Sequence, residues 1–146
     1  MRHARERSEA VAAGLRTFGG LEHRLEEIAT VDGVLYVNDS KATNVASALV
    51  GIESFPGGVH AILGGRSKGG GFAELAPVVA ERCRAAYLIG ETASELREAL
   101  APAGVPLHNC HDLERAVDAA SAAAEPGDVV LLSPACPSYE DRKSVV

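Results

Sequence analysis

The residues best suited to bind a small anionic ligand form one polar heptapeptide, Asn38-Asp39-Ser40-Lys41-Ala42-Thr43-Asn44. It follows an apolar run at residues 34–37 that is typical of a buried strand. It precedes residues 45–53, whose apolar side chains recur at helical spacing and whose first turn Thr43 or Asn44 can cap. The heptapeptide is therefore predicted to join the carboxyl end of a strand to the amino end of a helix, where open α/β sheets bind anions.

Two further loops carry hydrogen-bond donors after apolar runs. Residues 64–71 are rich in glycine and present Lys68 and Arg66 to an anion, but the lysine precedes the glycines, so this is not a P-loop. An exposed glycine-rich turn is the alternative. Residues 133–138 offer two hydroxyls and several backbone amides to a carboxylate, the alternative being a proline-stiffened loop. For Cys136 we favour packing over a nucleophilic role, since no histidine is placed to activate it.

Other candidate residues are ambiguous when taken alone. Arg24 can reach a nucleotide phosphate with its fork of donors or pair with a neighbouring glutamate. Asp39 and Lys41 can form an ion pair with each other. Alternatively, Asp39 can accept a hydrogen bond from a ribose hydroxyl and Lys41 can contact a phosphate. In residues 108–111, His108 is expected to end a strand and His111 to start a helix, which disfavours a metal site.

The remaining pattern predicts an α/β protein with a doubly wound, mostly parallel Rossmann-like sheet. Asp32-Gly33 between two strand-like runs predicts an antiparallel hairpin that opens the sheet. Strands are expected at residues 59–63, 85–89, 105–108 and 129–132, and helices at 72–82, 92–100 and 112–124. Because loops that follow parallel strands meet at one edge, the three polar loops are expected to lie together.

Composition narrows the class of protein. The 146 residues are 47% hydrophobic and 23% charged, which fits one globular domain rather than a disordered chain. A net charge of -6 with few aromatic residues argues against nucleic acid as a partner. No apolar run is long enough to cross a membrane, and the three cysteines suggest neither a disulfide framework nor a zinc site. We expect a cytoplasmic monomer.

Taken together, the motifs resemble the carboxy-terminal domain of the Mur ligase family, in the branch that adds D-glutamate. The resemblance covers most of the chain and depends on four strings: His23-Arg24-Leu25-Glu26, Asn38-Asp39-Ser40-Lys41-Ala42-Thr43-Asn44, Leu63-Gly64-Gly65 with Lys68, and Leu131-Leu132-Ser133-Pro134-Ala135-Cys136-Pro137-Ser138. The second string is the most discriminating, because related ligases and folylpolyglutamate synthases carry other residues there.

The resemblance implies an ATP-dependent ligase that joins D-glutamate to UDP-N-acetylmuramoyl-L-alanine in peptidoglycan synthesis. It assigns ATP contacts to Arg24, Asp39 and Lys41, with the arginine at a phosphate and the aspartate at the ribose. It assigns the D-glutamate carboxylates to Thr43, Lys68 and Ser138 and to the backbone at Tyr139. No catalytic residue or metal ligand is expected here, and magnesium ligands are expected on a central domain.

The resemblance also predicts how the chain is divided. Residues 1–20 are expected to be the tail of a central ATPase domain and a linker, and residues 21–140 the glutamate ligase domain. The P-loop ATPase domain, the amino-terminal domain and the last helix of the family are expected to be missing, so that the fragment is inactive alone. Residues 141–146 match one reading frame of a sequencing adapter and are expected to be a non-native tail.

Two other functions remain open. A free-standing α/β module that senses an amino acid or nucleotide would bind its ligand tightly without any partner domain. A related ligase adding another amino acid is disfavoured by the heptapeptide.

Overall fold

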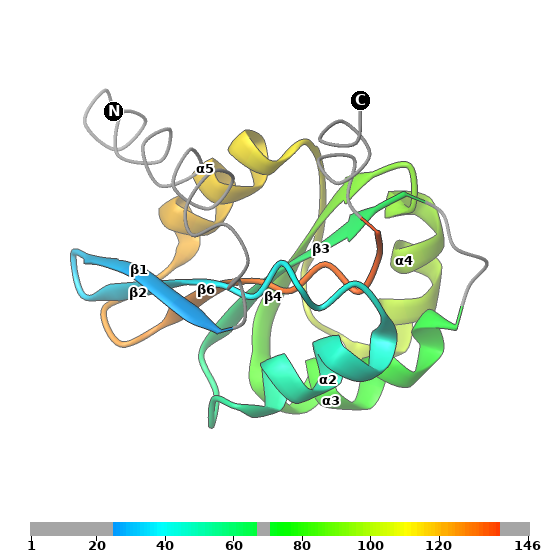
Figure 1. The fold of residues 1–146 in the computed structure, drawn as a ribbon, viewed down its shortest axis with the longest axis horizontal. Coiled ribbons are helices and arrows are strands. Elements are labelled where there is room, and N and C mark those ends of the chain that lie inside the picture. Colours follow the sequence, from blue (N-terminus) through cyan, green and yellow to red (C-terminus); the bar gives the residue numbers. More distant parts are fainter. Residues whose placement is uncertain (1–24, 67–70, 138–146) are drawn as a thin grey trace.

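The protein is described by a computed structural model over residues 25–66 and 71–137 (Figure 1). Its elements in chain order are β1 (Glu26–Val31), β2 (Val34–Asn38), α2 (Val45–Glu53), β3 (Val59–Gly65), the 3₁₀ turn η1 (Phe72–Glu74), α3 (Leu75–Arg82), β4 (Cys83–Gly90), α4 (Ala93–Leu100), the 3₁₀ turn η2 (Ala101–Ala103), β5 (Leu107–His111), α5 (Leu113–Ala123) and β6 (Val129–Leu132).

The described strands form one six-stranded sheet in the order β1-β2-β6-β3-β4-β5. All neighbours are parallel except β1 and β2. Asp32 and Gly33 both have positive φ, 54° and 82°, as the two central residues of a type I′ hairpin turn require. The predicted α/β class, the mostly parallel sheet and its opening hairpin are confirmed.

Helices cover both faces of the sheet. Figure 1 shows α5 on one side and α2 and α3 on the other. Along β2 the side chains alternate between the faces, since Val34 and Tyr36 pack in the α5 cluster and Val37 in the α2–α4 cluster. Each central strand is thus buried on two sides, which explains the uninterrupted apolar runs in the sequence.

The boundaries of β5 differ from the prediction. The strand begins at Leu107, after Gly104 in a left-handed conformation and after Pro106, whose carbonyl accepts a hydrogen bond from the Ala86 N–H. It extends to His111, so the prediction that His111 starts a helix is wrong. Asp112 is the N-cap of α5 instead, because its side chain accepts from the Arg115 N–H at 2.9 Å.

One smaller difference concerns the start of a helix. The predicted helix at residues 72–82 begins as the 3₁₀ turn η1 and becomes α-helical at Leu75.

No helix in the described ranges has the length and apolar character needed to cross a lipid bilayer.

Candidate functional site at the carboxyl edge of the sheet

Three loops meet at the carboxyl edge of the sheet, as predicted. They follow β2, β6 and β3, which are neighbours in the sheet. The Ala135 N–H donates to the Ala42 carbonyl at 2.7 Å and the Gly64 N–H to the Pro134 carbonyl at 2.9 Å. The Arg66 N–H donates to the Pro137 carbonyl, also at 2.9 Å. We call these three loops, within residues 38–44, 64–66 and 133–137, the carboxyl-edge site.

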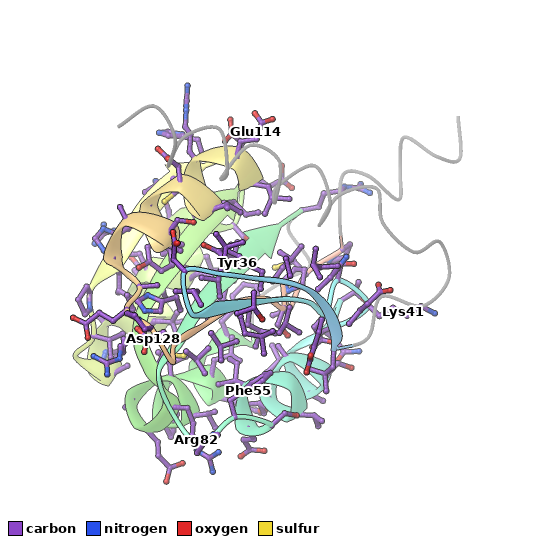
Figure 2. The ribbon with its side chains drawn as sticks, turned by 90° about the vertical axis from the view of Figure 1, so that its left-hand side faces the viewer. Tyr36, Lys41, Phe55, Arg82, Glu114 and Asp128 are labelled. Carbon is purple, nitrogen blue, oxygen red and sulfur yellow. The ribbon has the colours of Figure 1, made fainter. Side chains whose placement is uncertain are left out.

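The heptapeptide is ordered by its own side chains. The Asn38 carboxamide oxygen accepts from the Ser40 N–H at 2.9 Å, which makes an Asx-turn directly after β2. Asn44, rather than Thr43, caps α2, because its side chain accepts from the Ser47 N–H at 2.8 Å. Thr43 is half-buried and Lys41 exposed, and Figure 2 shows the Lys41 side chain pointing away from the sheet.

Asp39 joins distant segments from a buried position. Asp39 is only 3% exposed. One carboxylate oxygen accepts from the Leu25 N–H at 3.2 Å, and the other accepts from the Ser133 hydroxyl at 2.9 Å. Both carboxylate oxygens thus take part in the fold, and a contact from this carboxylate to a ligand would add to these bonds or replace one of them.

The Asp39–Ser133 pair explains a glycine inside α2. A Cβ built on Gly51 would collide with Asp39 Oδ2 and lie 2.9 Å from Ser133 Oγ. Ser133 therefore bonds a carboxylate 94 positions away in the chain, and does not merely satisfy its local backbone. A glycine within a helical pattern was the available sequence signal for this close approach.

Cys136 is a fully buried residue of the loop after β6. Its Sγ is 3.6 Å from Thr92 Oγ1, which agrees with the predicted packing role. Two glycines on the same edge have no room for a side chain. A Cβ on Gly64 would meet the Ile89 carbonyl, and one on Gly65 would lie 2.5 Å from the Pro137 carbonyl. The loops therefore pack backbone against backbone.

The histidine-containing segment at residues 108–111 lies on β5, the far edge strand. The His108 ring stacks on Tyr87 at a centroid distance of 5.1 Å, while His111 is exposed. Burial, with the Asp112 charge, raises the pKa of the Cys110 thiol. Over residues 25–66 and 71–137, no three His, Cys, Asp or Glu residues are grouped to hold a metal ion.

The seven predicted ligand-binding residues divide into two groups. Asp39, Lys41 and Thr43 lie in the described loop after β2, which the loop after β6 contacts through the Ala135–Ala42 hydrogen bond. The other four calls, on Arg24, Lys68, Ser138 and Tyr139, fall outside the described residues. The binding roles of all seven residues stay predictions.

Comparisons with known proteins identify the family. The family model described as "Mur ligase, glutamate ligase domain" matches residues 23–136. The chain belongs to the Mur ligase family. Two curated relatives carry the name UDP-N-acetylmuramoylalanine--D-glutamate ligase. One, from Acidobacterium capsulatum, is 48% identical over 91% of this chain, and one from Burkholderia mallei is 54% identical over 87%. These matches span 29% and 25% of the two relatives.

Solved structures show that the Mur ligase fold extends to more distant proteins. A murein peptide ligase from Psychrobacter arcticus matches with a TM-score of 0.62 at 16% identity, over 85% of this chain and 29% of that one. A bifunctional folylpolyglutamate synthase/dihydrofolate synthase from Yersinia pestis matches with a TM-score of 0.61 at 23% identity, over 88% and 31%. At these identities the likeness concerns the fold alone.

Proposed function

We propose that this chain is the D-glutamate-binding domain of an ATP-dependent ligase that extends UDP-N-acetylmuramoyl-L-alanine during peptidoglycan synthesis. The observation that carries the proposal is the pair of relatives with that activity in their names, at 48% and 54% identity. The meeting of three donor-bearing loops at one edge supports it, because a dicarboxylic amine needs several donors around one small space.

The chemistry requires an activated carboxylate, because a free carboxylate is a poor electrophile. ATP supplies the phosphate that makes an acyl phosphate, and the amine of D-glutamate then attacks its carbonyl carbon and displaces phosphate. On this proposal Thr43, Lys68, Ser138 and the Tyr139 backbone hold the glutamate carboxylates. This orients the amine for attack and lowers the entropic part of the barrier.

The nucleotide contacts are proposed for Arg24, Asp39 and Lys41. Lys41 is exposed on the loop after β2, which suits a cation that meets a phosphate. Asp39 fits a ribose hydroxyl less simply, since both of its oxygens already accept hydrogen bonds. Magnesium would be held mainly by other parts of a longer ligase, and the remaining substrate would be bound there too.

A chimeric ligase tests this function. Residues 21–140 replace the matching region of the Acidobacterium capsulatum relative, and ATP-dependent ligation is measured with D-glutamate, L-glutamate and other amino acids. We expect product with D-glutamate. A folded chimera that prefers a different amino acid would contradict the proposal, as would tight D-glutamate binding and sensing without any ligation.

A substitution sharpens the same test. Thr43→Val removes a hydroxyl from the proposed glutamate contacts and should raise KM for D-glutamate about tenfold, the value of one hydrogen bond to a charged group, with a smaller change in kcat. Thr30→Val is the matched control, because Thr30 is exposed on β1. Equal effects of the two substitutions would remove Thr43 from the site.

A further inference from the structure

Thr92 stands at the N-cap of α4 but its side chain does not cap the helix. Threonine at this position usually accepts a hydrogen bond from the first turn. Here no such bond is made, and the φ and ψ angles of -89° and 3° are not those of an ordinary cap. The residue is 1% exposed, so its hydroxyl must find partners elsewhere in the protein.

The partners of Thr92 belong to the carboxyl-edge site. Its Oγ1 accepts from the Gly65 N–H at 3.0 Å and lies 3.3 Å from the Gly65 carbonyl oxygen. The Thr92 N–H donates to the same carbonyl at 3.3 Å. The hydroxyl is also 3.6 Å from Cys136 Sγ, in the loop after β6. One side chain thus contacts a residue in each of two site loops.

The two residues that flank Gly65 bind the loop after β6 through backbone hydrogen bonds. The next residue, Arg66, donates its N–H to the Pro137 carbonyl, and Gly64 donates to the Pro134 carbonyl. Little movement is available around these bonds. A Cβ on Gly90 would lie 2.7 Å from the Gly65 carbonyl oxygen, and one on Gly65 would lie 3.3 Å from Cys136 Cβ.

We propose that Thr92 is a positioning residue of the carboxyl-edge site, whose hydroxyl fixes the end of β3 against the loop after β6. It touches no substrate. It holds Gly65 in one loop against Cys136 in the other, and hence sets the spacing of the two loops. The effect on ligand affinity rests on the proposed function of D-glutamate binding, whereas the effect on the loops does not.

The first measurement is independent of any ligand. Amide hydrogen exchange is followed by NMR in the 146-residue chain and in Thr92→Val, Thr92→Ala and Thr92→Ser. We expect exchange of the Gly64, Gly65 and Arg66 amides to quicken about tenfold in the valine and alanine variants, through local opening. Thr92→Ser keeps the hydroxyl and should stay within about twofold of the parent. Alanine serves if valine cannot be packed.

A matched control separates this effect from general loss of stability. Tyr36→Phe removes a hydroxyl whose partner is Ser121 Oγ at 2.7 Å, between β2 and α5. It should leave exchange at residues 64–66 unchanged after correction for the unfolding free energy. Unchanged exchange in Thr92→Val and Thr92→Ala, or equal quickening in Tyr36→Phe, would overturn the inference.

The second measurement connects Thr92 to the ligand. In the chimeric ligase, Thr92→Val should raise KM for D-glutamate about tenfold, with rescue by Thr92→Ser and no change in Tyr36→Phe. If the chimera uses another amino acid, the proposed function fails while the exchange result still decides the role of Thr92. Quickened exchange with an unchanged KM would overturn the positioning role.

Discussion

The two ends of the parallel strands both bury polar side chains, but the groups and their partners differ. At the carboxyl edge, Asp39 and Thr92 bond hydroxyls and backbone amides of loops. At the amino edge, His60 at the start of β3 lies 3.0 Å from the carboxylate of Asp128 just before β6 and 2.9 Å from the Tyr87 hydroxyl. Figure 2 places Lys41 and Asp128 at opposite ends of the molecule.

The amino-edge cluster has the character of a structural network. Asp128 Oδ2, the oxygen that His60 contacts, also accepts from the Glu125 N–H at 3.0 Å. The other oxygen, Oδ1, lies 3.2 Å from Arg84 Nε. Burial alone would raise the pKa of Asp128, but the hydrogen bonds from Glu125 and His60 and the charge of Arg84 lower it overall. Burial also raises the pKa of Tyr87 to about 12, with smaller contributions from Cys110 and Asp128.

The two edges therefore have different roles, one in stability and one in holding loops that can meet a ligand. The buried amino-edge groups bond to one another across neighbouring strands, which stabilises the sheet. The carboxyl-edge groups hold loops whose remaining donors, Lys41 and Thr43 among them, are at least partly exposed. Substitutions at the two edges should therefore change stability and ligand affinity in different proportions.

The largest expected loss follows from crowding the carboxyl edge. Gly64 has a φ of 124°, and a Cβ there would collide with the Ile89 carbonyl of the neighbouring strand. Backbone strain and overpacking together should make Gly64→Ala destabilising by about 3 kcal/mol or more. Urea unfolding of the variant and the unsubstituted chain measures this loss of unfolding free energy. Gly104→Ala is the control, because Gly104 shares a positive φ but has open space around it. Equal losses would mean that strain alone, without crowding, sets the cost.

An intermediate loss is expected at the amino edge, with a defined pH dependence. Asp128→Asn should cost about 2 kcal/mol at pH 7, the order of a hydrogen bond to a charged group. Because the folded pKa of Asp128 lies below its unfolded value of about 3.9, the parent loses this stabilisation as pH falls through the folded pKa. Unfolding free energies from pH 7 to pH 2 should therefore converge for the two proteins. Parallel curves would show that the Asp128 charge does not stabilise the fold.

The smallest expected loss concerns the glycine in α2. Gly51→Ala gains about 1 kcal/mol in helix propensity but displaces the buried Asp39–Ser133 pair, at about 1–3 kcal/mol, so a net loss of about 1 kcal/mol is expected. Gly57→Ala, with nothing within 4 Å of its Cβ, is the control. A stabilised Gly51→Ala would show that Asp39 can move at no cost, and would sharpen the contrast with the rigid amino edge.

Local patterns predicted the elements well where the chain carries its own signal. Asp32-Gly33 determines the hairpin turn because both positions need a positive φ that these two residue types tolerate. The apolar runs at β3 and β6 predicted strands because both faces of those strands are buried. The prediction failed at β5, where the mostly polar residues 108–111 continue an edge strand that needs no continuous apolar run.

The candidate site was predicted in part. Its three loops could be assigned to one edge from topology alone, since parallel strands place their carboxyl ends together. The role of Thr92 could not, because a threonine before a helix is the ordinary pattern of an N-cap and nothing local indicates that the hydroxyl bonds to β3. The bond between Ser133 and Asp39 could not be predicted either, because the two residues are 94 positions apart, although a glycine inside a helical pattern at Gly51 did indicate a close approach.

The sequence by itself determined the class of fold, the hairpin, the polar heptapeptide and the resemblance to the Mur ligases, because periodicity, turn chemistry and motif spacing are local properties of the chain. Only the tertiary structure decided which polar groups are buried and with whom they bond. Those pairings depend on strand order. The strand β6, which is the last in sequence within the described chain, lies between β2 and β3, and this brings Ser133 to Asp39 and Cys136 to Thr92.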